Sequence, residues 1–277
     1  MVSKDQRRRQ LAREKYERQQ QRRSADRRKA KRRNVIIASV VAVTLAAGAA
    51  VYASTGLAGG SDQESDRPAA APTPSRAPDP CHRPAKGTPS QKTWAKEPAM
   101  SLDTSAAYSA KLATTCGTID LKLDAGKAPH TVNSFAFLAG QGYFDHSRCH
   151  RLVDEQLHIL QCGDPKGTGR GTPGYTIPDE NLKDPRLKGG VYPAGTVAMA
   201  NRYDGASEKS RNSGGSQFFL VYQDSKLPPN YTPFGTITGG MDVLRKIAKA
   251  GSTTDPQTRN SAPNATVVID KASVKKS

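Results

Sequence analysis

The chain has 277 residues, of which 35% are hydrophobic and 6% aromatic, and its formal net charge is +17 at pH 7. Most of that charge lies in residues 1–34, which contain 15 Lys and Arg but only 4 Asp and Glu. This distribution excludes the body-wide basic surface of a nucleic-acid-binding domain, and the composition is not that of a collagen, a long coiled coil or a multi-span membrane protein.

The first predicted element is a membrane span, which we place at residues 35–58. Residues 35–53 carry no charge and would extend roughly 28 Å as a helix, about the thickness of a bilayer's hydrocarbon core. A cleaved signal peptide is the alternative, because Val51-Tyr52-Ala53 satisfies the small-residue rule for cleavage. We favour an uncleaved signal anchor, because the 34 residues that precede the span make an unusually long basic region for a signal peptide.

The charge asymmetry around the span predicts the topology of the chain. Basic segments stay in the cytoplasm, so we expect residues 1–34 to be a cytoplasmic tail and the remainder to lie outside the cell membrane. The tail would contact anionic lipid, and no nucleic-acid partner is expected. Residues 59–100 follow as a Pro-rich extracytoplasmic linker with eight prolines from Pro68 to Pro98. Within this linker, Cys81 and Trp94 are expected to dock on the following domain.

Residues 101–277 are predicted to form one mainly β domain. Apolar residues alternate along 108–112 and 117–123, which indicates a hairpin. A helix is expected after Pro129, and a second helix over Met241–Ala250. Short strands are predicted at Cys149–Val153, Leu157–Gln161, Gly195–Asn201, Gln217–Tyr222, Phe234–Ile237 and Thr266–Ile269. This pattern favours a closed antiparallel barrel with helical caps.

Four residues could suggest a metal site, but their spacing matches no standard zinc pattern. Neighbouring residues on a strand also point to opposite faces, so no metal is predicted. These residues are Cys149, His150, His158 and Cys162.

The four cysteines of an exported domain are instead expected to form disulfides, for which three connectivities exist. We favour Cys149–Cys162 together with Cys81–Cys116. The alternation of side chains along a strand argues against the first pair unless a bulge intervenes.

Two glycine-rich segments match the motifs of other enzymes only in part. Gly169–Gly174 has the spacing of a dinucleotide-binding loop, but Pro173 and Pro178 prevent the helix that this loop should begin. Gly214–Phe218 lacks the second glycine of a hydrolase nucleophile elbow. Neither segment predicts a nucleotide site or a nucleophilic serine.

Five short motifs in order resemble those of the cyclophilins, from about Tyr108 to the C-terminus. The motifs are Cys149-His-Arg-Leu-Val153, Leu160-Gln-Cys-Gly-Asp164, Met199-Ala-Asn201, Gly215-Ser-Gln-Phe-Phe219 and Tyr231-Thr-Pro-Phe-Gly235. The resemblance implies a closed eight-stranded barrel capped by two helices, and peptidyl-prolyl cis-trans isomerase activity. It implies no cofactor and no covalent intermediate, because rotation about an amide breaks no bond.

The resemblance also implies the roles of individual residues. Arg151 corresponds to the catalytic arginine that donates to the prolyl nitrogen, Gln161 to the glutamine that orients it, and Phe219 to the floor of the proline pocket. Further substrate-binding positions are His158, Ile159, Ala200, Asn201, Gln217, Leu227 and Tyr231. The implied partners are proline-containing peptides and unfolded exported proteins.

The chain departs from the family's usual pattern at three places. Two extra residues lie between Arg151 and Gln161, His158 stands where a pocket aromatic is usual, and Lys226 stands where many members carry tryptophan. An active isomerase tethered outside the membrane is the leading hypothesis. The alternatives are a catalytically weak module of the cell envelope that binds Pro-containing peptides, and a protein whose basic tail is the working part.

Overall fold

The computed structural model describes residues 78–203, 209–257 and 260–277. The chain divides into two units, residues 1–72 and 73–277, and every described residue belongs to the second. The predicted cytoplasmic tail and membrane span lie outside the described residues. In the part of the chain that is described, no helix has both the length and the apolar character needed to cross a bilayer.

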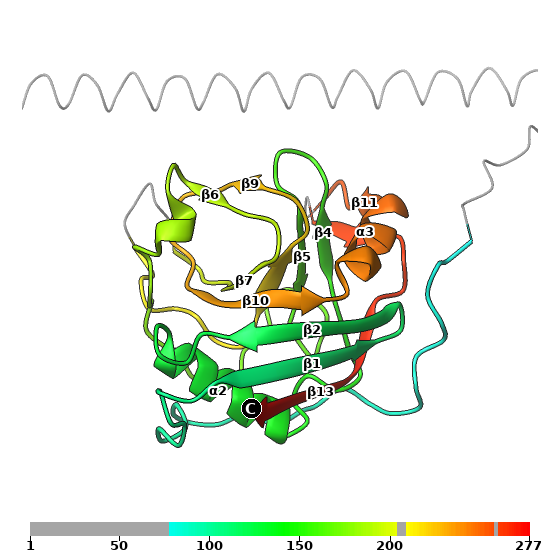
Figure 1. The fold of residues 1–277 in the computed structure, drawn as a ribbon. Coiled ribbons are helices and arrows are strands. Elements are labelled where there is room, and N and C mark those ends of the chain that lie inside the picture. The colour runs from blue at the N-terminus through cyan, green and yellow to red at the C-terminus, as the bar shows by residue number, and fades with distance from the viewer. Residues whose placement is uncertain (1–77, 204–208, 258–259) are drawn as a thin grey trace, which may run out of the picture. The chain divides into compact units, whose positions relative to one another are not determined.

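One antiparallel sheet organises the domain, with the strand order β3-β13-β1-β2-β10-β7-β8-β5-β4 (Figure 1). Its strands are β1 (Tyr108–Thr114), β2 (Gly117–Leu123), β3 (Ser147–Arg148), β4 (Arg151–Val153), β5 (Ile159–Cys162), β7 (Thr196–Met199), β8 (Phe218–Val221), β10 (Pro233–Gly239) and β13 (Val268–Lys276). Two small sheets pair β6 (Val191–Tyr192) with β9 (Ser225–Lys226), and β11 (Ser252–Thr254) with β12 (Ser261–Pro263). The helices are α2 (Pro129–Gly140), α3 (Met241–Lys249) and the 3₁₀ turn η1 (Pro185–Leu187).

The predicted closed, eight-stranded barrel is wrong, because the main sheet has nine strands and stays open as a curled half-barrel. Its two edge strands, β3 and β4, are consecutive in the chain and are separated only by Cys149 and His150. The Cys149 N–H donates to Val267 O at 2.9 Å, whereas the His150 N–H donates to Gln161 O at 3.1 Å. The chain thus changes partners between these two residues, since β3 pairs with β13 and β4 pairs with β5.

The hairpin and both helices that the sequence predicts are present. β1 and β2 pair in register from Tyr108–Leu123 to Thr114–Gly117. Helix α2 begins at Pro129, and Glu180 of a distant loop accepts the N–H groups of His130 at 3.1 Å and Thr131 at 2.9 Å. These two donors are unpaired within any helix, so the carboxylate satisfies them and suits the positive end of the helix dipole.

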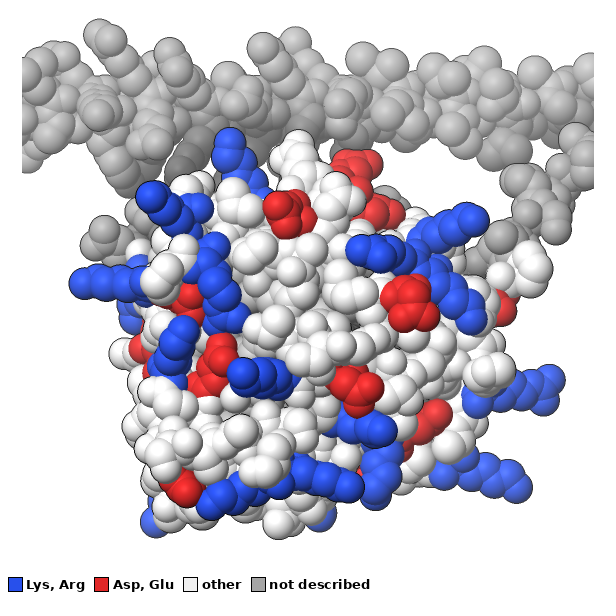
Figure 2. All heavy atoms as spheres, in the orientation of Figure 1, with Lys and Arg blue, Asp and Glu red and all other residues white. Residues whose placement is uncertain are grey.

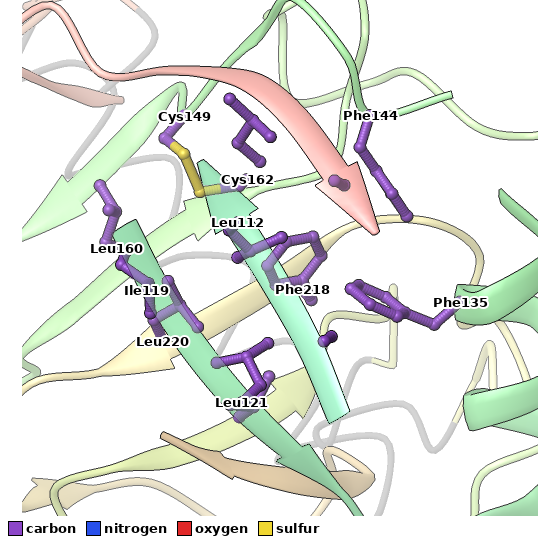
Figure 3. Packing of buried hydrophobic residues seen from close by; sticks show 14 of the residues in the cluster. Leu112, Ile119, Leu121, Phe135, Phe144, Cys149, Leu160, Cys162, Phe218 and Leu220 are labelled. Atoms are coloured by element: carbon purple, nitrogen blue, oxygen red, sulfur yellow. A yellow bond between two sulfur atoms is a disulfide. The ribbon is translucent and has the colours of Figure 1, made fainter. Parts of the chain in front are cut away.

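The core lies between α2 and the concave face of the sheet. Phe135 of α2 packs its ring against Phe144, Phe218 and Phe234, with centroid distances of 5.0, 5.3 and 5.4 Å. Leu112, Ile119 and Leu121 extend the same cluster along β1 and β2 (Figure 3). Alternate residues of these strands are therefore buried, which is the pattern that the sequence predicts.

Residues 78–100, here called the N-terminal strap, lie along the outside of this domain. The strap, cyan in Figure 1, passes β13, where Ala85 N–H donates to Asp270 at 2.9 Å, and reaches the end of α2, where Lys92 donates to Gln141 O at 2.8 Å. It includes the two docking residues expected from the sequence, Cys81 and Trp94. The part of the predicted linker that the structure describes is thus packed on the domain.

Both disulfides that the sequence analysis favours are present. Cys81–Cys116 fastens the strap to the β1–β2 turn, and Cys149–Cys162 joins the segment between β3 and β4 to the end of β5 (Figure 3). The alternation of side chains along a strand does not count against Cys149–Cys162, because β4 begins only at Arg151. Cys149 lies in the irregular segment where the chain changes partners.

Candidate active site

The convex face of β5, β7 and β8 carries a second apolar cluster, separate from the core. Along β8, Phe218 and Leu220 point into the core, whereas Phe219 and Val221 point to this second cluster. An antiparallel sheet commonly exposes one face to water. A buried apolar cluster on that outer face is not needed to form the core, so it is a candidate for a binding site. Its buried members are Ile159, Leu187, Tyr192, Ala198, Phe219 and Val221.

A row of directly paired residues crosses four strands at the edge of this cluster. Arg151 pairs with Gln161, Gln161 with Phe219, and Phe219 with Ala198. Residues that face each other across an antiparallel pair project from the same side of the sheet. The register therefore places a guanidinium, an amide and a phenyl ring side by side, and these three residues come from three of the five motifs.

The polar residues of the row form a directed chain of hydrogen bonds. The Arg151 Nη1 donates to Gln161 Oε1 at 3.4 Å, and Gln161 Nε2 donates to Gln217 Oε1 at 2.9 Å. Gln217 Nε2 then donates to Gly171 O, also at 2.9 Å. Each glutamine accepts a hydrogen bond through its amide oxygen and donates one through its amide nitrogen. The orientation of one side chain therefore determines the orientation of the next. Arg151 itself is half-buried, which leaves part of its guanidinium facing the groove.

Phe219 forms the base of an aromatic pocket. Its side chain is 2% exposed, and its ring lies 5.6 Å from Tyr231 in an edge-on arrangement and 6.1 Å from Tyr192. Ile159 is buried in the same cluster, and Leu227 is half-buried against it. These residues surround Phe219 with the apolar walls that the sequence resemblance implies.

Tyr192 also contacts the pocket, although the sequence analysis did not single it out. Its hydroxyl donates to Tyr231 O at 2.7 Å and accepts the Tyr231 N–H at 3.1 Å, and burial raises the pKa of this phenol. Tyr192 belongs to the two-residue strand β6, which is too short to show alternation.

A groove continues from the row past Gln217. It encloses a cavity of about 280 Å³ lined on one side by Gly171 and Thr172 and on the other by Ala200 and Asn201. The Ala200 N–H donates to Gln217 O at 2.8 Å, so this segment continues the pairing of β7 with β8 beyond Met199. An extended peptide could pair with that backbone while its side chains enter the groove.

The Asn201 side chain braces the wall of the groove. Its Nδ2 donates to Asp179 Oδ1 at 3.1 Å and to Asn230 O at 2.8 Å, while its Oδ1 accepts the Tyr203 N–H at 3.2 Å. These bonds tie three loops together. What the Ala200–Asn201 segment presents to a ligand is therefore mainly its backbone.

His158 and Lys226 mark the outer rim of the site. The His158 ring packs edge-on against Tyr222 with centroids 5.6 Å apart, and the backbone N–H of His158 donates to Ser225 Oγ at 2.9 Å. Lys226 is exposed on β9, next to Leu227 of the pocket. The rim thus carries polar groups where the resemblance leads one to expect aromatic rings.

His150 lies behind the row and is 6% exposed. Burial lowers its pKa and the Asp164 charge raises it in part, so the ring stays neutral near pH 7. The cysteines beside it are oxidised. Within the described ranges, no group of three or more His, Cys, Asp and Glu side chains is placed to hold a metal ion.

The family comparison agrees with this arrangement. Residues 109–274 match the model of the cyclophilin type peptidyl-prolyl cis-trans isomerase family. Because this match covers more than half of the chain, the protein belongs to that family.

Individual relatives carry the same description. The chain is 51% identical over 155 residues to a probable peptidyl-prolyl cis-trans isomerase B of Mycobacterium leprae, covering 53% of this chain and 50% of the relative. It is 34% identical over 131 residues to peptidyl-prolyl cis-trans isomerase B of Bacillus subtilis, covering 47% of this chain and 82% of the relative. The chain thus spans about half the length of the mycobacterial relative.

A solved structure is also similar. The crystal structure of a cyclophilin type peptidyl-prolyl cis-trans isomerase of Cryptosporidium parvum aligns with a TM-score of 0.50 and 25% sequence identity. The alignment covers 62% of this chain and 99% of that chain. The N-terminal strap, residues 78–100, precedes residue 109, where the match to the family model begins.

Proposed function

We propose that the chain is a peptidyl-prolyl cis-trans isomerase whose active site is the row Arg151–Gln161–Phe219. The observation that carries the proposal is the register, which sets a permanent cation beside an apolar pocket on an otherwise solvent-facing side of the sheet. The family membership and the names of the relatives support the same activity.

The arrangement suits rotation about an X-Pro bond. Amide resonance imposes a barrier of about 18–20 kcal/mol, and a donor on the prolyl nitrogen favours the pyramidal form in which that resonance is lost. Arg151 supplies a donor that remains charged at every physiological pH. Phe219, Tyr231 and Leu227 would hold the proline ring while the acyl side turns. Because only the twisted state accepts the Arg151 bond fully, the interaction lowers the barrier rather than merely binding substrate.

The experiment is a prolyl-peptide isomerisation assay on the full chain. Arg151→Ala should lower kcat/KM by about 100-fold, the usual consequence of losing one transition-state donor. The matched control is Arg148→Ala, which removes an exposed arginine on β3 and should leave the rate unchanged. Wild-type activity in Arg151→Ala would contradict the assignment. Peptide binding without turnover in the wild-type chain would favour the Pro-peptide-binding module.

We further propose that the domain works outside the cell membrane, tethered by residues 35–58, on exported or envelope proteins. The uncharged segment behind the basic tail supports the tether. Two disulfides in the described domain support an oxidising compartment. The basic tail would hold anionic lipid on the cytoplasmic side.

A further inference from the structure

The N-terminal strap contacts the loop that borders the groove. We call residues 164–174 the groove loop. The Trp94 N–H donates to Pro173 O at 2.8 Å. Gly174 has a φ of +95°, and a Cβ added there would lie 2.5 Å from Trp94 O. Only glycine fits both this conformation and this close approach, so the strap and the groove loop are in tight contact at this point.

The Trp94 ring anchors this part of the strap to the body of the domain. The ring meets Phe137 of α2 edge-on at 5.1 Å and lies 5.8 Å from Tyr143. Further along, Ser101 N–H donates to Asn133 of α2 at 3.1 Å, and Cys81 is bonded to Cys116 on the other side. The chain is thus attached to the domain on both sides of Trp94, at Cys81 before it and at Ser101 after it.

The groove loop in turn orients the polar row of the active site. Gly171 O accepts the amide of Gln217, whose oxygen accepts from Gln161, which accepts from Arg151. The Gly171 N–H donates to Asp164 at 3.0 Å, so the loop is held at its start as well. Burial alone would raise the pKa of Asp164, but the hydrogen bonds from the groove loop outweigh it and lower that pKa. This carboxylate therefore stays ionised and accepts hydrogen bonds from three residues of the loop, Lys166, Thr168 and Gly171.

We propose that Trp94 is a positioning residue of the active site: by fixing the strap against Pro173 and Gly174, it holds the groove loop where Gly171 O orients Gln217, Gln161 and Arg151. Trp94 does not line the groove. Its catalytic consequence rests on the proposed function, whereas its effect on the two glutamine side chains does not. The strap is then a functional part of the domain, although the family match begins only at residue 109.

The test compares Trp94→Ala with Trp94→Phe in the full chain. The first readout is the NMR signals of the side-chain amides of Gln161 and Gln217, which report their hydrogen bonds directly. Both should shift or broaden in Trp94→Ala and return toward their wild-type positions in Trp94→Phe, which keeps an aromatic contact with Phe137. The second readout is turnover: kcat/KM should fall about tenfold in Trp94→Ala, mostly through kcat, because small misplacements of a catalytic group cost most in the transition state.

A second pair of variants tests the contact from the side of the groove loop. Gly174→Ala places a methyl group against Trp94 O, so it should reproduce the signal changes of Trp94→Ala. Gly189→Ala is its matched control, since Gly189 also has positive φ, at +79°, but has open space around it. Val274→Ala, on β13 and away from the groove loop, controls for a general loss of stability and should move neither readout.

The outcomes separate the two proposals. Unchanged amide signals in both Trp94→Ala and Gly174→Ala would overturn the positioning role, whatever the activity. Equal signal changes in Val274→Ala would overturn it too, because the effect would then be unspecific. If the signals move only in Trp94→Ala and Gly174→Ala while the wild-type chain shows no isomerisation, the positioning role stands and the proposed function fails.

Discussion

Arg151 and Phe219 acquire their proposed roles from neighbours that the same register supplies. Arg151 would be an ordinary exposed arginine on an edge strand if Gln161 did not hold its Nη1 at 3.4 Å. Phe219 would be a core residue if β8 were shifted by one position, because a one-residue slip moves every side chain to the other face. The chemistry of the site thus depends on strand pairing as much as on residue type.

The first residue-scale prediction concerns Tyr192→Phe. Removing the hydroxyl leaves the Tyr231 N–H and C=O without the partner seen here, in a place where Tyr192 is fully buried. The free energy of unfolding should fall by about 1–3 kcal/mol, as measured by urea denaturation. Affinity for a prolyl peptide should fall as well, because Tyr231 walls the pocket.

Tyr108→Phe is the control for this prediction. Tyr108 lies on β1, away from the pocket, and its hydroxyl accepts the Asp103 N–H at 3.0 Å. Loss of this hydroxyl should lower stability but leave peptide affinity unchanged. An equal loss of affinity in both variants would show that the Tyr192 hydroxyl has no special connection with the pocket.

A second residue-scale prediction concerns cyclosporin, the cyclic peptide that blocks many cyclophilins. By resemblance, a tryptophan at the pocket edge packs on the drug and donates its indole N–H to it, and Lys226 occupies that place here. A lysine stem covers apolar surface but offers no ring. Lys226→Trp should therefore strengthen inhibition by about tenfold or more, given the worth of one hydrogen bond and an aromatic contact.

Inhibition constants of the full chain measure this effect. Lys246→Trp, which adds a tryptophan on the exposed side of α3, should leave the inhibition constant where it is in the wild-type chain. Low-nanomolar inhibition of the wild-type chain would refute the argument, because it would show that Lys226 does not weaken binding of the drug.

At the scale of elements, helix α2 connects the core, the strap and the groove wall. Its Phe135 fills the core, its Phe137 supports Trp94, and its first turn is capped by Glu180. His130 in that turn bonds Glu97 of the strap at 2.6 Å. The hydrogen bond to Glu97, together with the charges of Glu97 and Glu180, raises the pKa of His130 although burial opposes it.

This pair predicts a pH dependence of stability. A histidine whose pKa is raised on folding stabilises the folded state fully below its unfolded pKa of about 6.5, and the stabilisation is lost as pH rises through the folded value. The difference in urea midpoint between wild type and His130→Gln should therefore be larger at about pH 6 than at about pH 9. Fluorescence of Trp94, the only tryptophan of the chain, reports the transition near the strap.

His82→Gln is the control, because His82 is exposed elsewhere on the strap. Its difference in urea midpoint from wild type is measured at the same two pH values for comparison. A constant difference between wild type and His130→Gln across this range would contradict the proposed contribution of the ion pair. Since the His130 side chain is 46% exposed, we expect a small effect.

For the whole molecule, charge is distributed unevenly between the tail and the folded domain. On the face seen in Figure 2, basic and acidic side chains are interspersed, whereas residues 1–34 contain 15 Lys and Arg against 4 Asp and Glu. The tail, rather than the domain, is therefore the segment suited to an anionic surface.

Protease treatment of intact protoplasts tests the proposed topology. With residues 1–34 inside and the domain outside, protease should remove the domain and spare the tail, as detected by antibodies to each. Lysed protoplasts, in which both parts become accessible, are the control. A domain released into the medium and beginning near Ser54 would show that the span is a cleaved signal peptide instead.

Much of the fold was predictable because its signals are local. The alternation along β1 and β2, the proline at the start of α2 and the glycine pair before α3 are each local signals within about a dozen residues. The strands β3, β6 and β9 have only two residues each and show no such pattern. They form because distant partners offer them hydrogen bonds, which no local window of sequence contains.

The sequence by itself determined the family, the hairpin and both helices, and it pointed to Arg151, Gln161 and Phe219 as candidate site residues, because residue types in a fixed order specify these features. Only the tertiary structure decided that the barrel stays open and that Cys149 lies outside a regular strand, where it can reach Cys162. The same holds for the hydrogen bond from Tyr192 to Tyr231 and for the contact between the strap and the groove loop. These four features depend on where the chain changes partners between β3 and β4, and on contacts between segments far apart in sequence. The free energy of such contacts comes from packing in three dimensions, which linear spacing does not encode.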